Sequence, residues 1–268
     1  MTGAYLRLRP LFTRLLSGLD ALWTGIWLGV LDRDDFHAID EAHYASTDRY
    51  RDDAHTARGL FEWEERALSE HFPAEGRLLL LAAGGGRESY ALARRGFLVE
   101  GHECNPALVE YANAFLSRAG VDATVRVLPR DASPSGDEIF DGVIVGWSGY
   151  MLIAGRDRRV ALLRALRQRV AEGAPILLSF FTRSTLAPRY RTIAAVSNVL
   201  RRLRGAFPIE RGDDLAPNFL HRFTEEEVRG ELADGGFAMT SYAPQGEGPF
   251  DSGYAVGVAS LRALVPRA

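Results

Sequence analysis

The chain has 268 residues, of which 47% are hydrophobic and 25% are charged. This length and composition suit one large globular domain and argue against global disorder. The net charge of −3 argues against a protein that coats nucleic acid, because such binding depends on neutralising phosphates. We therefore expect a small-molecule partner and no nucleic acid.

The chain has a single cysteine, Cys104, and no lysine. One thiol cannot form an internal disulfide, and no cysteine or histidine cluster has the spacing of a zinc site. Since every basic residue is an arginine, P-loop phosphate binding, Schiff-base chemistry and serine–lysine catalysis lack their central group. We expect a cytoplasmic protein that needs no metal.

Apolar side chains recur at steps of three and four between Phe12 and Val30, which predicts an amphipathic helix. Arg14 and Asp20 interrupt this apolar run and no small-residue cleavage site follows it, so we predict neither a membrane span nor a signal peptide. We expect the apolar stripe to pack on its own domain. A membrane-surface helix, a partner-binding helix and the pairing of two copies in a homodimer are the alternatives.

The segment 32–66 that follows is polar and has a helical tendency. We expect residues 1–72 to form a helical cap that folds over the substrate site as a lid. The reason is that the apolar stripe needs a surface and an acceptor pocket needs a roof.

From residue 77 the pattern changes to short apolar strands that alternate with helices. The predicted strands lie at 77–83, 97–103, 123–129, 140–147 and 174–181. A further helix and strand follow within 222–244, and a last strand within 252–264. The alternation predicts an α/β fold with a parallel sheet covered by helices on both faces.

The ends of the first three predicted strands carry the residues that suggest chemistry. The first strand runs into glycines 84–86, whose backbone N–H groups can approach a ligand more closely than any Cβ atom would permit. Glu103 ends the second strand about 20 residues later, where its carboxylate can accept two hydrogen bonds from a ribose diol. Asp131 follows the third strand and can accept from the exocyclic amine of adenine. Together the three strand ends predict an adenosine pocket.

These motifs resemble those of the class I S-adenosylmethionine-dependent methyltransferases. The segment LLLLAAGGGRE is similar to the family's glycine motif, with Gly84 and Gly86 at its second and third glycine positions. HECNP is similar to the acidic second-strand end, and HRFTEEEVRGELADGGF to a helix of many small-molecule methyltransferases. The resemblance implies that residues 73–268 form a Rossmann-like methyltransferase domain, with three layers around a seven-stranded sheet.

The resemblance also implies a cofactor and the residues that bind it. The cofactor would be S-adenosyl-L-methionine, released as S-adenosyl-L-homocysteine after in-line displacement of its methyl group. Glu103 would hold the ribose hydroxyls, and Cys104 would pack against the adenine ring. The adenine edge would meet the Asp131 side chain and the Ala132 N–H. Near the sulfonium, the resemblance implies the residues Gly146 and Trp147.

Two positions depart from the family's pattern. Ala82 stands where the first glycine is expected, and Leu80 stands where the family usually has an acid that orients the methionine end of the cofactor. Alanine adds only a Cβ atom, so we expect the close approach of the backbone to survive. Carbonyls of the loop, or an acid or tyrosine of the N-terminal cap, are the candidates to hold the methionine amine instead.

Four residues are candidates to take a proton from the acceptor. His221 is the first to test, since it precedes a helix expected to border the substrate cavity. Tyr150 follows the fourth predicted strand, and His43 and Tyr44 lie in the N-terminal segment. None has a diagnostic spacing, and an acceptor that is already nucleophilic at neutral pH needs no base.

Arginines are concentrated between Arg183 and Arg211, a stretch in which Glu210 is the one acid. We interpret the run as the solvated face of a helix, with an acidic substrate or an RNA phosphate as the alternative ligand.

The sequence thus predicts an enzyme that methylates an O, N or C atom of a small molecule, such as a metabolite of bacterial specialised metabolism. Methylation of peptides or proteins, and cofactor binding without catalysis, are the alternatives. A nicotinamide-dependent dehydrogenase is disfavoured because Ser89 stands where its last glycine is expected. An aminopropyl transferase is disfavoured because the sequence has no matching acidic substrate pattern.

Overall fold

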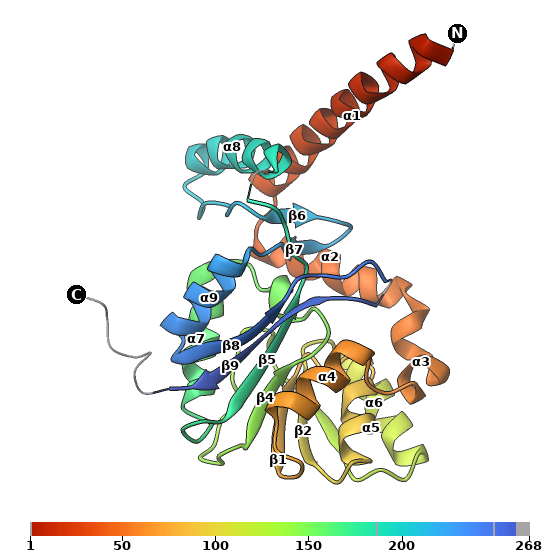
Figure 1. The fold of residues 1–268 in the computed structure, drawn as a ribbon, viewed down its shortest axis with the longest axis vertical. Coiled ribbons are helices and arrows are strands. Elements are labelled where there is room, and N and C mark those ends of the chain that lie inside the picture. Colours follow the sequence, from red (N-terminus) through yellow and green to blue (C-terminus); the bar gives the residue numbers. More distant parts are fainter. Residues whose placement is uncertain (1, 186, 249, 261–268) are drawn as a thin grey trace, which may run out of the picture.

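The computed structural model describes residues 2–185, 187–248 and 250–260 (Figure 1). The sheet is preceded by α1 (Thr2–Val30), α2 (Arg33–Ser46), the 3-10 turn η1 (Asp48–Arg51), α3 (Asp53–Ala57) and α4 (Glu62–His71). Later in the chain come α5 (Arg87–Ala93), α6 (Pro106–Arg118), the 3-10 turn η2 (Tyr150–Leu152), α7 (Arg156–Arg167), α8 (Pro188–Leu203) and α9 (Glu225–Asp234).

The strands are β1 (Arg77–Leu81), β2 (Leu98–Glu103), β3 (Thr124–Val127), β4 (Gly142–Val145), β5 (Pro175–Phe180), β6 (Asp213–Leu215), β7 (Phe219–His221), β8 (Phe237–Ala243) and β9 (Gly253–Ala259). All except β6 and β7 form one seven-stranded sheet in the order β3-β2-β1-β4-β5-β9-β8. β6 and β7 pair as a separate antiparallel hairpin. The predicted fold class, a seven-stranded sheet with helices on both faces and an N-terminal helical segment, is confirmed.

The sheet is mixed, whereas the alternation of strands and helices predicted a parallel one. β9 runs antiparallel to both of its neighbours, β5 and β8. In the described part of the link between β8 and β9 there is no helix, and strands joined without a crossover element run antiparallel. The end of the last predicted strand, at 261–264, lies outside the described residues.

The continuous apolar run of β1 follows from burial on both faces of the sheet. Leu78 and Leu80 pack in one core cluster with α4, α5 and α6, while Leu79 and Leu81 pack in another with α7 and α9. Neighbouring side chains of a strand point to opposite faces. A central strand that is covered by helices on both sides therefore has no polar face.

The carboxyl ends of the central parallel strands lie at one level. Leu81 of β1 is aligned with His102 of β2 and with Val145 of β4. The loops that follow these three strands therefore begin side by side, at the edge where ligands of open α/β sheets bind.

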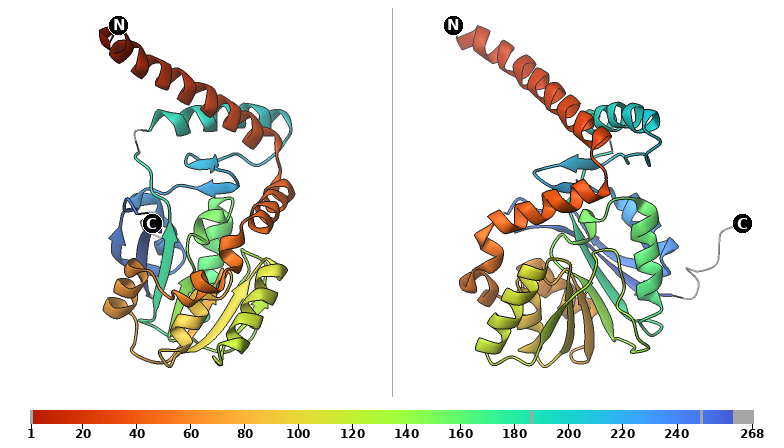
Figure 2. Two further views of the ribbon diagram at one scale, coloured as in Figure 1. Left: turned by 90° about the vertical axis from the view of Figure 1, so that its right-hand side faces the viewer. Right: turned by 180° about the vertical axis from the view of Figure 1, so that it is seen from behind.

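Of the N-terminal helices, α1 projects from the molecule as an arm, whereas α2, η1 and α3 form a cover over one edge of the sheet. α1 crosses α8 beyond the carboxyl edge of the sheet, and its amino-terminal part extends away from the body (Figures 1 and 2). From the base of the arm, α2, η1 and α3 run along that edge toward α5 and α6 (Figure 2). We use the term helical arm for α1 and α8.

The expectation that the apolar stripe of α1 packs on its own domain is wrong for most of the helix. Residues 2–20 are exposed, and the buried residues of α1 are Ala21, Thr24, Gly25, Leu28 and Gly29. The physical reason is that α1 packs on α8 through a face made mainly of small residues, with Leu28 as its one large apolar side chain. No single helix in the described part of the chain has both the length and the hydropathy of a membrane span, although α1 and α2 together pass as a pair bent by 118°.

Candidate active site

A cavity lies at the carboxyl ends of β1, β2 and β4, under the cover formed by α2, η1 and α3. It encloses about 850 Å³, counting the space that is open to solvent. The predicted cofactor residues that line it are Ala82, Gly84, Glu103, Cys104, Ala132 and Trp147. Gly86, Asp131 and Gly146 do not line the cavity, and of the predicted proton acceptors Tyr44 alone does so.

The loop after β1 takes backbone conformations that favour glycine. Gly84 and Gly86 have φ values of 51° and 89°, and Ala82, which replaces a glycine of the family's motif, has a φ of 54°. A Cβ atom added at Gly84 would meet no heavy atom within 4 Å. The backbone at Gly84 therefore borders open space, as a loop that cradles a ligand must.

Glu103 connects the tip of β2 with the glycine loop. Its Oε2 accepts the Gly84 N–H at 3.0 Å, and its Oε1 accepts the Asn105 N–H at 2.9 Å. Oε1 also accepts from the Cys104 thiol at 3.2 Å. Each carboxylate oxygen has about two lone-pair sites, so acceptor capacity remains on Oε2. The structure thus holds a carboxylate in fixed orientation at the cavity, with room for further donors.

The next residue, Cys104, is an unreactive part of the wall. Burial raises the pKa of its thiol to about 12, and the charge of Glu103 adds to the shift. The thiol therefore stays protonated at neutral pH. Arg130 donates to its Sγ at 3.4 Å and also forms an ion pair with Asp40 of α2. Because Asp40 accepts a second hydrogen bond from Asn218, this pair fastens α2 to the cavity wall.

The two groups predicted to bind the adenine edge already have partners in the protein. Asp131 accepts from Nε of Arg158 at 2.5 Å, and it lines a separate surface depression beside α7. Ala132 lines the cavity, but its N–H donates to the carbonyl oxygen of Pro129 at 3.0 Å.

Trp147 lies in an aromatic cluster at one wall of the cavity. Its backbone N–H donates to Glu88 at 3.2 Å and its indole Nε1 donates to Ser252 at 3.0 Å. Its ring centroid lies between 5.0 and 6.4 Å from those of Tyr50, His55, Phe61 and Phe250. A cationic centre bound beside this wall would face aromatic rings.

Beside this wall, Arg87, Glu64 and Glu88 form a buried ion cluster. Arg87 pairs with both carboxylate oxygens of Glu64, at 2.6 and 2.7 Å, and its Nη2 also donates to Glu88 at 2.7 Å. Burial alone would lower the pKa of Arg87, but the charges of Glu88 and Glu64 outweigh burial and raise it. Arg87 is therefore charged and has its partners inside the protein, and both Arg87 and Glu88 line the cavity.

The cover contributes lining residues that the sequence did not single out, Tyr50, His55 and Thr56. Burial raises the pKa of Tyr44 and of Tyr50, so both phenols are neutral. Burial lowers the pKa of His55, and the charge of Arg87 acts in the same direction. The neutral imidazole of His55 can therefore accept a proton near pH 7.

No spacing in the sequence connects the cover with the glycine loop, so no local signal could have identified Tyr50 or His55. Glu88 differs, because it stands two residues after the last of the three glycines and could have been noticed. An acid in the first turn of a helix is ordinarily explained by the helix dipole, which concealed its position at the cavity.

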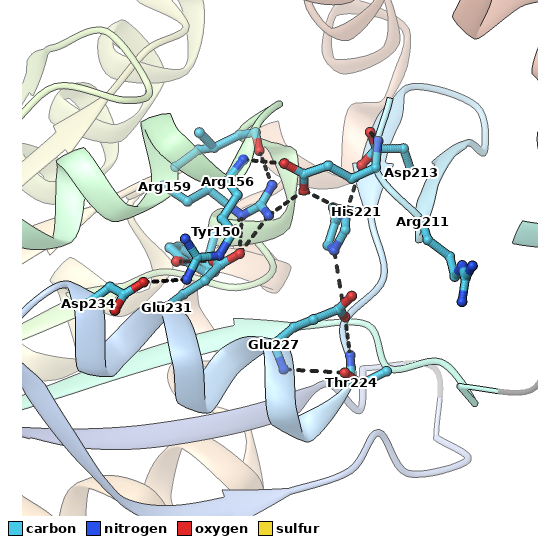
Figure 3. Close-up of polar contacts among 12 residues, drawn as sticks. Tyr150, Arg156, Arg159, Arg211, Asp213, His221, Thr224, Glu227, Glu231 and Asp234 are labelled. Carbon is cyan, nitrogen blue, oxygen red and sulfur yellow. Dashed lines mark hydrogen bonds and ion pairs between the residues drawn. The ribbon is translucent and has the colours of Figure 1, made fainter. Parts of the chain in front are cut away.

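His221 and Tyr150, both predicted as proton acceptors, lie in a buried polar network away from the cavity (Figure 3). Nδ1 of His221 is 2.6 Å from Asp213, and its Nε2 is 3.9 Å from Glu227 of α9. The Tyr150 hydroxyl donates to Glu231 at 2.6 Å. The relative exposures of 1% for His221 and 0% for Tyr150 leave no surface for an acceptor.

His43, the remaining candidate, lies on α2. Its ring centroid is 5.6 Å from that of Tyr44, but His43 does not line the cavity.

The same network contains a group that a metal ion could use. Glu210, Asp213 and His221 place carboxylate and imidazole atoms within 4.8 Å of one another. Each of them already has a partner, because Arg159 pairs with Glu210 at 2.7 Å while Asp213 and His221 bond to each other. Arg159 also pairs with Glu231 at 2.7 Å, so the cluster joins α7, α9 and the β6–β7 hairpin. We therefore assign it to stabilisation of the fold.

Known proteins resemble this chain in structure and not in sequence. No protein-family model matches the chain, and no curated protein sequence matches it. A SAM-dependent methyltransferase from Methanosarcina mazei is 19% identical with a TM-score of 0.59, over 76% of this chain and 99% of that one.

Two further solved structures contain the cofactor or its product. Magnesium protoporphyrin IX methyltransferase from Synechocystis PCC 6803, with SAH bound, is 18% identical with a TM-score of 0.51, over 87% of this chain and 90% of that one. An amino pentose methyltransferase from Micromonospora echinaspora, with SAM bound, is 17% identical with a TM-score of 0.52, over 82% and 94% of the two chains. From its sheet order, its glycine loop and these likenesses, the chain has the fold of the class I S-adenosylmethionine-dependent methyltransferases.

Proposed function

We propose that the protein is an S-adenosylmethionine-dependent methyltransferase that acts on a small molecule. The observation that carries the proposal is Glu103, a carboxylate held at the cavity by the N–H groups of Gly84 and Asn105, whose Oε2 keeps acceptor capacity for a ribose hydroxyl. S-adenosylmethionine supplies an electrophilic methyl group when bound. The protein then has to align the acceptor with that group and exclude water.

Glu88 is our candidate to hold the methionine amine, in place of the acid that is missing at Leu80. Both of its hydrogen bonds, from Arg87 and from the Trp147 N–H, are accepted by Oε1. Oε2 is therefore left as an acceptor at the cavity. On this assignment Glu88→Gln weakens the binding of S-adenosylmethionine more than that of methylthioadenosine, which has no amine. Equal weakening of both ligands would contradict the assignment.

His55 is our candidate to take a proton from the acceptor. It lines the cavity, and it also lines an open surface depression with Arg49 and Arg58. An acceptor that enters from this depression passes the imidazole before it reaches the aromatic wall. His55 is neutral at the start of the reaction, as a general base must be.

The test is whether methyl transfer occurs. The protein is incubated with methyl-labelled S-adenosylmethionine and fractionated metabolites, and labelled products are identified by mass analysis, with Glu103→Ala as the control. We expect labelled small molecules to form with the unmodified protein and not with Glu103→Ala. If calorimetry detects no binding of S-adenosylhomocysteine, the proposal is overturned. Tight binding without transfer to any fraction would instead support a cofactor-binding partner that has no activity.

A further inference from the structure

Most of the large apolar side chains of α1 form a stripe that faces away from the rest of the molecule, while Leu6 is exposed on another side of the helix and Leu28 is buried. We call this set the apolar stripe, and its members are Tyr5, Leu8, Leu11, Phe12, Leu15, Leu16, Leu19, Leu22, Trp23, Ile26 and Trp27. Each of them is between 39% and 62% exposed. At about 100° per residue the stripe covers roughly 160° of the helix circumference. It is therefore a continuous exposed apolar surface along the whole helix, far more than the scattered apolar residues of an ordinary protein surface.

The opposite face of α1 makes the contact with α8. A Cβ atom added at Gly25 would stand 2.9 Å from the Cβ of Val196, and one added at Gly29 would stand 2.7 Å from Cδ1 of Leu200. The glycines thus let the two helices approach closely. Arg201 strengthens the crossing, because it donates to the Leu28 carbonyl oxygen near the end of α1. The crossing fixes α1 with its apolar stripe outward.

The width of the apolar stripe indicates which kind of partner can cover it. A two-helix seam between copies of the chain would cover a narrow strip of about two residues per seven, and would leave much of the stripe in water. A flat apolar surface can cover all of it. A helix of this kind, with aromatic and leucine side chains on one face, is typical of helices that lie in the plane of a membrane.

The charged residues of α1 indicate that the surface it binds is negatively charged. Residues 1–19 contain Arg7, Arg9 and Arg14 and no acid. In helical projection Arg9 lies at one edge of the stripe, and Arg7 and Arg14 lie beyond the other. The first acid, Asp20, is paired with Arg189 of α8. Arginines in these positions can keep their alkyl stems in the apolar layer while the guanidinium groups reach phosphates.

We propose that the apolar stripe is a docking surface for a membrane of anionic phospholipid, on which α1 lies in the plane. α8 also has exposed apolar residues, Val199 and Leu203, which are 62% and 81% exposed, and Arg202 is exposed beside them. The arm lies beyond the carboxyl edge of the sheet, since α8 follows the carboxyl end of β5 (Figure 1). Docking therefore brings to the membrane the end of the molecule that carries the cavity.

The experiment is flotation of the full chain with vesicles of phosphatidylcholine that contain about 30% phosphatidylserine, compared with phosphatidylcholine alone. Leu15→Glu places a charge in the middle of the stripe. Ser17→Glu is its matched control, because it adds the same charge on the other side of the same exposed stretch. Neither position contacts the sheet, and a thermal unfolding curve checks that both variants stay folded.

We expect the unmodified chain to bind the anionic vesicles. Leu15→Glu should weaken this binding about tenfold or more, as the loss of one buried leucine implies, whereas Ser17→Glu should largely retain it. Tryptophan emission should shift to shorter wavelength on binding, and Trp23→Phe/Trp27→Phe should remove that shift. Absence of vesicle binding, or equal effects of the two glutamates, would overturn the proposal. A stable dimer that Leu15→Glu dissociates, without lipid binding, would assign the stripe to a second copy of the chain and overturn it too.

Discussion

The backbone carbonyl of Tyr50, in the cover, lies directly against Gly85 of the loop that follows β1, at the place where any other residue would have its Cβ atom. Two segments far apart in the sequence therefore meet without space for one methyl group. The cover can close over the cavity only because position 85 is glycine.

Replacing Gly85 by alanine should displace the cover. The added methyl group overlaps the Tyr50 carbonyl, which we expect to cost about 1–3 kcal/mol, as overpacking does. Limited proteolysis should then cleave segment 47–58 faster, and the affinity for S-adenosylhomocysteine should fall. Gly18→Ala is the control, since a Cβ atom there meets nothing within 4 Å. Unchanged proteolysis of Gly85→Ala would show that the contact does not hold the cover in place.

Replacing Glu103 by alanine should weaken the binding of S-adenosylhomocysteine by about 1.5–3 kcal/mol, because hydrogen bonds to a charged carboxylate are lost. Titration calorimetry measures the change. Asp131→Ala is a matched control, since it also removes a strand-end carboxylate but one that pairs with Arg158 outside the cavity. An equal loss of affinity in both variants would contradict the assignment of Glu103 to the cofactor site and of Asp131 to a position outside it.

Replacing His55 by asparagine should reduce kcat by roughly 10²–10⁴-fold if its imidazole takes the proton, while cofactor affinity changes little. In the unmodified protein, kcat should fall with decreasing pH below about 6.5, because burial and Arg87 lower the pKa of His55 and the base must be neutral. The variant should lose that limb of the profile. A profile that keeps the limb in His55→Asn would assign it to another group.

Replacing Arg87 by methionine should destabilise the fold by about 3–5 kcal/mol, because Glu64 and Glu88 are left buried without their partner. Urea unfolding followed by circular dichroism measures the loss. Adding Glu64→Leu to the same chain should recover part of it, since one of the two unpaired carboxylates is then gone. Further loss in the double variant would show that Glu64 contributes by packing rather than by charge.

His221 should make stability depend on pH. Burial alone would lower the pKa of His221, but Asp213 and Glu227 outweigh it and raise the pKa above its ordinary 6.5. The contribution of the charged imidazole is therefore fully present below pH 6.5 and is lost as the pH rises through the raised value. The difference in free energy of unfolding between the unmodified protein and His221→Gln should shrink between pH 6 and pH 8. A constant difference would mean that His221 stays neutral in the fold.

The sequence by itself determined the layered sheet and the position of the site along the chain. Apolar runs such as Leu78–Leu81 require burial on both faces, and residues that end neighbouring parallel strands must meet at one edge, so Glu103 could be placed beside Gly84 without coordinates. These inferences depend on local pattern and on a rule of sheet geometry.

Only the tertiary structure decided what each remaining polar or apolar group faces. Asp131 turned to Arg158, His221 to Asp213, and His55 to the cavity, because each contact depends on how different elements of the chain pack together. The stripe of α1 was visible as a pattern, but its outward direction was set by the glycines that pack on α8. A periodic sequence specifies which face of a helix is apolar, whereas what covers that face depends on where the other elements lie.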